Sequence, residues 1–335
     1  MNFNIQGRGT DTILNSGKLF IKRMFHVTSM SAAACLLVIG CDKTNKTTGP
    51  ERESQVIPEF TATINDNNTR TTLKDHNVIW SEGDKVAIFL NSDKAVEYKV
   101  KEGCGGNVTT TLVPVDSKYE SGRPLAGKEA NIALYPYDYV QWCSRDNERF
   151  CVSINIPDKQ TYTPGTFGCG SMPMVAVSSS KDDTKLSFKN IYGVLKFRMK
   201  MDNVTVRSIE VSGNSNEKIA GSATFVYCSY DEDPSMEIMD AKYKLTLDCG
   251  NGVEVNSAEG VEFYIPVPPC TFTKGITVRF VTTGNDIVRR ITDELTIKRS
   301  TILSMPDVTS TPGFNNGNGT EELGEEKDYP YSWSY

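Results

Sequence analysis

Apolar and polar residues alternate over short segments along most of this chain. The sequence of residues 195–200 is LKFRMK, in which every second residue is apolar and the others are basic. A period of two is typical of a strand with one buried face. Residues 261–267 and 276–280 alternate in a similar way, and no stretch of ten or more residues carries an apolar stripe of helical period. The pattern therefore predicts an all-β fold built of β-sandwiches.

The length of the chain, 335 residues, suggests about two domains. A polar stretch, SSSKDD at 178–183, is the best candidate for the boundary. We therefore expect an N-terminal sandwich domain over 54–180 and a C-terminal one over 184–308. From 309 to 335 the chain is rich in Gly, Asn and Glu, which predicts a flexible acidic tail with an aromatic end.

The first 40 residues are typical of a secretory leader. Basic residues precede an apolar run at 27–40, which is shorter than the roughly 20 residues that a membrane-spanning helix needs. The sequence VIGC at 38–41 resembles a bacterial lipobox, which implies a signal peptide over 1–40 and lipidation of Cys41. Acyl chains on Cys41 would anchor the protein stably in a membrane. Residues 41–53 contain no large apolar side chain, and we expect them to form a tether.

Charge and histidine content exclude several classes of function. The net charge is −6 and no basic block occurs, which argues against nucleic-acid binding. The only histidines are His26, within the leader, and His76. A metal site with two histidines is therefore excluded in the mature chain, and an enzyme of the Ser/His/Asp type would have to rely on His76. Chemistry carried mainly by carboxylate, tyrosine or lysine side chains stays open.

The cysteines and two local segments give only weak signals of a site. Seven cysteines follow Cys41, and no CxxC motif occurs, so we expect mainly unpaired, buried thiols. The acidic turn at 230–234 (YDEDP) lacks the spacing of a calcium loop. The glycine-rich turn at 102–106 (EGCGG) lacks the pattern of a phosphate loop. We expect both turns to be solvated loops without a bound ion.

An ordered set of short segments resembles the fimbrillin family, the lipoproteins of type V pili and related adhesins of anaerobic Gram-negative bacteria. The matching segments are 60–64 (FTATI), 69–71 (TRT), 80–86 (WSEGDKV), 133–137 (ALYPY), 156–160 (IPDKQ), 172–176 (MPMVA), 190–195 (NIYGVL) and 219–221 (IAG). The resemblance implies two transthyretin-like β-sandwiches in tandem, no enzymatic activity and no cofactor. It also implies a role in adhesion or pilus assembly at the outer membrane. From the residues alone, we expect Trp80 to fill a sandwich edge with its indole N–H bonded to backbone. We also expect 135–137 to form an edge strand, because Pro136 cannot donate a hydrogen bond to a ladder.

The resemblance also implies assembly with other pilin subunits by β-strand exchange. In such pilins an arginine-specific protease removes the lipidated N-terminus together with the first strand, and a strand from another subunit fills the groove. Two arginines are candidates for this processing: Arg52 in the tether, and Arg70 after the first predicted strand. The alternative remains that neither bond is cut.

The C-terminus departs from the family pattern. Residues 309–328 contain only two large apolar side chains, Phe314 and Leu323, which is too few for a donor strand. Tyr329, Tyr331, Trp333 and Tyr335 alternate with small or polar residues and would share one face of an extended strand. They could form a short donor, a docking tail, a surface that stacks on sugars, or an unstructured end. Without a donor strand the protein could be a tip or accessory subunit, or a lipid-anchored adhesin that binds host or bacterial surface ligands.

A second hypothesis comes from another class of function, a glycan-binding surface lipoprotein of a polysaccharide-uptake system. Such a protein would also be built of sandwiches. It should present an exposed aromatic platform with affinity for polysaccharides, whereas a pilin or adhesin should form fibres or pass a strand between subunits.

Overall fold

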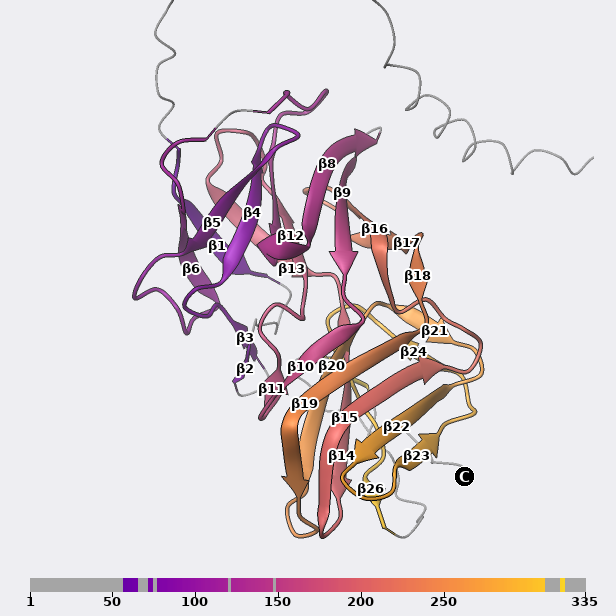
Figure 1. The fold of residues 1–335 in the computed structure, drawn as a ribbon. Coiled ribbons are helices and arrows are strands. Elements are labelled where there is room, and N and C mark those ends of the chain that lie inside the picture. Colours follow the sequence, from indigo (N-terminus) through magenta and orange to yellow (C-terminus); the bar gives the residue numbers. More distant parts are fainter. Residues whose placement is uncertain are drawn as a thin grey trace, which may run out of the picture. The chain divides into compact units, whose positions relative to one another are not determined.

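The structure, a computed structural model, describes residues 57–65, 72–74, 77–119, 122–146, 149–310 and 320–322. The chain in these ranges is built of β-strands, with one short 3-10 helix, η1 (Tyr137–Tyr139) (Figure 1). None of the described segments is α-helical. None of them forms a helix that is long and apolar enough to cross a membrane. The all-β prediction is therefore confirmed.

Seven strands close into a barrel around the first part of the hydrophobic core. Their order is β1 (Phe60–Ile64), β13 (Lys185–Asn190), β12 (Met174–Val177), β7 (Asn131–Tyr135), β4 (Lys85–Leu90), β5 (Ala95–Val100) and β6 (Thr109–Pro114). The first strand closes the ring, because β1 pairs in parallel with β13 and antiparallel with β6. β7 and β12 are buried along their whole length, as strands covered on both faces are.

Two further sheets pack face to face as a sandwich. One has the order β11 (Thr166–Phe167), β10 (Lys159–Thr163), β19 (Lys244–Val255), β15 (Val204–Gly213), β22 (Ile276–Thr282) and β23 (Ile287–Arg290). The other has the order β20 (Val261–Val267), β14 (Gly193–Lys200), β25 (Thr301–Ser304) and β27 (Thr320–Glu322), with β26 (Val308–Thr309) also paired to β14. Phe197 of β14 and Phe280 of β22 meet edge to face between the sheets, with ring centroids 6.0 Å apart. Leu195, Phe197 and Met199 are buried and the basic residues between them half-buried, so the alternation predicted at 195–200 is confirmed.

A further sheet combines strands from both halves of the sequence. Its order is β17 (Ser235–Ile238), β16 (Ala220–Cys228), β9 (Arg149–Ile156) and β8 (Val140–Asp146), and β18 (Ala241–Lys242) also pairs with β16. We call it the β8–β17 sheet. Two two-stranded antiparallel sheets complete the described strands: β2 (Thr72–Lys74) with β3 (Asn77–Ile79), and β21 (Cys270–Phe272) with β24 (Leu295–Ile297).

Strand pairing crosses the domain boundary expected at 180–184. β13 follows that boundary in the sequence, yet it lies in the barrel between β1 and β12. β9 pairs with β16, and β10 pairs in parallel with β19. The polar stretch 178–183 is a turn between β12 and β13, in which the Asp183 carboxylate accepts hydrogen bonds from Ser179 and from the Lys185 backbone. The two-domain division stays a prediction, and hydrogen-bonded strands join its two parts.

The described end of the chain returns to the sandwich. β27 lies within the segment expected to be a tail, 309–335, and pairs antiparallel with β25 opposite Thr301, Ile302 and Leu303. Ser310 is the last described residue before that strand. The prediction of a flexible tail otherwise concerns residues 311–319 and 323–335, which lie outside the described ranges.

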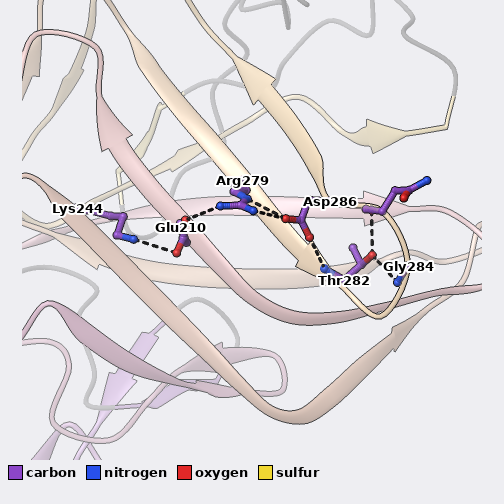
Figure 2. A network of polar contacts seen from close by, with 7 residues as sticks. Glu210, Lys244, Arg279, Thr282, Gly284 and Asp286 are labelled. Atoms are coloured by element: carbon purple, nitrogen blue, oxygen red, sulfur yellow. Dashed lines mark hydrogen bonds and ion pairs between the residues drawn. The ribbon is translucent and has the colours of Figure 1, made fainter.

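The outer face of the six-stranded sheet carries a ladder of alternating charges (Figure 2). Lys244 of β19 lies 2.9 Å from Glu210 of β15, and Glu210 lies 3.8 Å from Arg279 of β22. Arg279 also pairs with Asp286 in the turn before β23, and its hydrogen bond lowers the pKa of that carboxyl. The Thr282 backbone N–H donates to the same carboxylate at 3.3 Å. Opposite charges side by side across strands are typical of a solvent-facing sheet surface.

Candidate functional site: the slot of the first strand

β1 is a short strand with a strict alternation of buried and more exposed positions. Phe60, Ala62 and Ile64 are buried in the barrel, whereas Thr61 is exposed and Thr63 is half-buried. Aromatic and β-branched residues favour this extended geometry. The ring of Phe60 meets Tyr98 of β5 edge to face, with centroids 5.5 Å apart. β1 thus completes both the hydrogen-bond ladder and the core of the barrel.

Both ends of β1 are held by contacts with its neighbours. Tyr98 donates a hydrogen bond from its hydroxyl to the Pro58 carbonyl at 3.1 Å, and burial raises the pKa of Tyr98, so the donor keeps its proton at physiological pH. Lys101 lies 3.1 Å from Glu59. At the far end, the Asn65 backbone N–H donates to the Phe188 carbonyl of β13 at 2.9 Å.

Removal of β1 would leave a slot of matching shape. The facing edges of β6 and β13 would lose their ladder partners, and unpaired strand edges readily accept another strand. The positions of Phe60 and Ile64 would become apolar hollows, each worth about 1.5–3 kcal/mol when filled. The position of Ala62 between them has room only for a small side chain, since Ala62 is fully buried.

A cavity of about 670 Å³ adjoins the start of β1. Ile57 and Pro58 line it together with Leu90 and Asn91 at the end of β4 and Asn131 at the start of β7. Asn91 adopts a left-handed backbone with a φ of 48°, a conformation that asparagine tolerates better than most residues. The slot of β1 therefore continues into open space at the end where the chain enters the barrel.

The segments that carry the family resemblance meet in the core of the barrel. Trp80 packs edge to face against Tyr135 at 5.8 Å and against Phe188 at 5.1 Å between ring centroids. The Tyr135 hydroxyl donates to Asp84 Oδ1 at 2.9 Å, and the Ser81 backbone N–H donates to Asp84 Oδ2 at 2.8 Å. All three large side chains and Asp84 are buried. These motif residues therefore hold the fold together.

Two expectations about these motif residues are wrong. The buried Trp80 Nε1 has no hydrogen-bond partner among the described residues. The indole packs against the rings of Tyr135 and Phe188. β7 is a central strand, paired with both β4 and β12. It ends at Tyr135, so Pro136 follows the ladder and interrupts no hydrogen bond in it.

The acidic turn at 230–234 is held by the protein's own cations. Asp233 lies 3.3 Å from Lys189 and 3.0 Å from Arg299. Burial alone would raise the pKa of Asp233, but these two cations outweigh it and hold the pKa below its usual value. The described ranges contain no group of three His, Cys, Asp or Glu residues that could hold a metal ion.

Several predicted site residues lie outside the described residues. They are Cys41, Arg52, Arg70, Tyr329, Tyr331, Trp333 and Tyr335. The seven cysteines that follow Cys41 are all described, and none of them is part of a disulfide. The sequence predictions missed an aromatic cluster of Trp142, Phe225 and Tyr227 on the β8–β17 sheet, because its members are far apart in the sequence and one of them sits next to a β-bulge.

Comparison with known proteins returns solved structures alone, since no family model and no curated protein matches the chain. A candidate cell adhesion protein from Bacteroides ovatus is 10% identical, with a TM-score of 0.46, over 81% of this chain and 96% of its own. One from Bacteroides uniformis is 15% identical, with a TM-score of 0.42, over 82% of this chain and 98% of its own. The tip fimbrial protein Mfa3 from Porphyromonas gingivalis, truncated at its C-terminus, is 12% identical, with a TM-score of 0.31, over 82% of this chain and 100% of its own. Because these similarities are weak, the function of this chain has to be argued from its own residues.

Proposed function

We propose that this chain is a non-enzymatic, fimbrillin-like adhesin or fimbrial component that assembles with other subunits by β-strand exchange. The observation that carries the proposal is the position of β1. It is the first described strand, it closes the barrel between β6 and β13, and its three buried side chains fill the core. Once the chain is cut after it, this strand can leave without unthreading the described strands that follow it.

Arg70 is the better placed of the two candidate processing sites. β1 ends at Ile64 and β2 begins at Thr72, so a cut after Arg70 separates β1 from the remainder of the protein. A cut after Arg52 leaves β1 covalently attached. Strand exchange therefore requires cleavage at Arg70, or at another bond between these two strands.

The slot specifies the pattern of the strand that would replace β1. Large, small and large apolar side chains at alternate positions match Phe60, Ala62 and Ile64. The aromatic end of this chain places tyrosine or tryptophan at every second position from 329 to 335, and such rings are too large for the site of Ala62. We propose that the donor comes from another kind of subunit, and that this chain takes a tip, accessory or anchor position.

Before processing, the protein would be held at the outer membrane by acyl chains on Cys41, with residues 41–53 as tether. After cleavage it would be released from the lipid and would remain in the fimbrium through the exchanged strand. Its other partners would be host or bacterial surface ligands.

The test compares Arg70→Ala with the matched control Arg52→Ala in the full chain treated with an arginine-specific protease. We expect the wild type and Arg52→Ala to lose β1 and to form multimers with a partner subunit that resist detergent until heated. Arg70→Ala should stay monomeric. Equal assembly of Arg70→Ala, or cleavage after Arg70 without any strand uptake, would contradict the proposal.

A further inference from the structure

The register of the β8–β17 sheet gathers aromatic side chains on one face. Trp142 of β8 lies opposite Ser153 of β9, which lies opposite Phe225 of β16. In the next row of the same face, Cys151 of β9 lies opposite Tyr227 of β16. We call Trp142, Phe225 and Tyr227 the aromatic face. The other side of the sheet is the core side, where Val152, Ile154 and Val226 are completely buried.

A β-bulge turns Trp142 toward solvent. Val140 pairs with Ile154 and Trp142 with Ser153, so Gln141 is an extra residue in β8. Regular alternation would place residues 140 and 142 on the same side, and Ile154 lies on the core side. The extra residue shifts Trp142 to the opposite side, where it is 39% exposed. Ser153 donates a hydrogen bond to the Gln141 side-chain oxygen at 3.0 Å, which fixes the bulge. Bulges that redirect a side chain are common beside functional sites.

Small residues on the central strand let the rings approach one another. Ser153 and Cys151 are buried beneath their neighbours, and the rings of Trp142 and Phe225 meet across β9 with centroids 5.8 Å apart and a tilt of 49°. Phe225 and Tyr227 are two residues apart on β16, about 6.6 Å along the strand. The Arg149 guanidinium lies 5.0 Å from the centre of the Tyr227 ring. The result is a shallow aromatic strip with a hydrogen-bonding cation at one end.

The aromatic face differs in kind from the solvent-facing surface in Figure 2. There, Lys244, Glu210 and Arg279 cover the sheet with paired charges. Here, large apolar side chains stay partly exposed although water surrounds them. A contiguous apolar patch with polar groups around it indicates an interaction site.

We propose that the aromatic face binds a neutral polysaccharide chain lying along β16. Hydrogen-bonding side chains flank the rings: Gln141 and Arg149, and on β17 the exposed Glu237, which lies opposite Phe225. Aromatic rings stack on the apolar faces of sugar rings, and the Gln141 amide and Arg149 guanidinium can hydrogen-bond to hydroxyl groups at the edge. Among its described side chains the strip carries a cation, Arg149 on the Tyr227 ring, and a carboxylate, Glu237 opposite Phe225. These charges are opposite in sign, so the strip favours an uncharged ligand. The inference names a ligand class for the adhesive role proposed above and rests on that role.

The test is native gel electrophoresis of the full, unprocessed chain in gels that contain xylan, mixed-linkage glucan, mannan or starch, with alginate as an acidic comparison. Trp142→Ala and Phe225→Ala remove the strip. Tyr243→Ala is the matched control, because Tyr243 is 47% exposed and lies outside the face. Unchanged unfolding midpoints show that the variants remain folded.

We expect at least one neutral polysaccharide to retard the wild type and Tyr243→Ala. Trp142→Ala and Phe225→Ala should each weaken binding about tenfold, the effect expected from loss of one stacked ring. Three results would overturn the inference: no retardation by any neutral polysaccharide, equal retardation of Trp142→Ala, or retardation by alginate alone. The protein could also attach to a surface only when that surface is coated with protein, and lose this attachment in Trp142→Ala. That result would overturn the inference as well and assign the face to a protein partner.

The experiment separates this inference from the proposed function. Binding is measured before any cleavage at Arg70, so a failure of strand exchange leaves it unaffected. A protein that exchanges β1 but binds no neutral polysaccharide would refute the inference alone.

Discussion

The hydroxyl of Tyr135 donates a 2.9 Å hydrogen bond to Asp84, and this contact joins two motifs that lie 51 residues apart. The same hydroxyl accepts a hydrogen bond from the Gly170 backbone N–H at 2.9 Å. Burial is the largest cause of the raised pKa of Tyr135, so the group remains a donor. One buried side chain thus connects the turn before β4, the end of β7 and the loop before β12.

Tyr135→Phe should destabilise the protein by about 1.5–3 kcal/mol, because it removes a hydrogen bond to a buried carboxylate and leaves Gly170 without its acceptor. Urea unfolding measures the change. Tyr243→Phe, at an exposed position, is the control and should change stability by less than about 0.5 kcal/mol. Equal midpoints for the two variants would show that the contact contributes nothing.

A synthetic peptide of residues 57–65 should bind the protein cleaved after Arg70 once its own β1 has been removed. The same peptide with Ala62→Trp should bind at least about tenfold more weakly, because the site of Ala62 is closed to a large side chain. Fluorescence anisotropy of labelled peptides measures both affinities. Equal binding of the two peptides would mean that the slot does not select by shape.

The stabilising effect of the buried Cys228 thiol should decrease at alkaline pH. Burial raises the pKa of this thiol to about 12, against about 8.5 in an unfolded chain. The folded state therefore binds the proton more tightly, and the contribution to stability, complete below about pH 8.5, is lost as the pH rises toward 12. The stability difference between the wild type and Cys228→Ala should shrink by up to about 1.4 kcal/mol per pH unit above 8.5. Parallel stability curves for the two proteins would contradict this account.

Calcium and chelators should leave the thermal stability unchanged. Asp233 in the acidic turn is already paired with Lys189 and Arg299, so a cation would have to displace both. Differential scanning fluorimetry with calcium chloride or EDTA should give midpoints within about 1 °C of each other, since a ligand stabilises only if it binds the folded state. A calcium-dependent rise in midpoint that disappears in Asp233→Asn would place a metal site there.

Strands with one face on the core and the other toward solvent could be predicted from the sequence. Residues 195–200 alternate because one side faces the sandwich core, and period two is visible in the chain itself. β7 is buried on both faces, so its sequence has no alternation, and its central position could not be predicted from Pro136. The polar residues 178–183 form a tight turn of the barrel, and the composition of such a turn resembles that of a linker.

The slot and the aromatic face depend on pairings between distant strands. Closure of the barrel by parallel pairing of β1 with β13 joins residues more than a hundred positions apart, and no local pattern encodes it. Trp142 faces outward only because Gln141 is inserted as a bulge. A one-residue shift reverses the side to which a strand residue points, so sequence alternation alone assigns Trp142 to the wrong face.

The N-terminus and intact mass of the mature protein, taken from its own cells, test the central claim most directly. The account predicts that assembled protein begins at Thr71, directly after Arg70, and has lost Cys41, its lipid and β1. A lipid-modified Cys41 as the only form would contradict strand exchange at the β1 slot. The protein would then be a membrane-tethered adhesin, anchor or glycan binder.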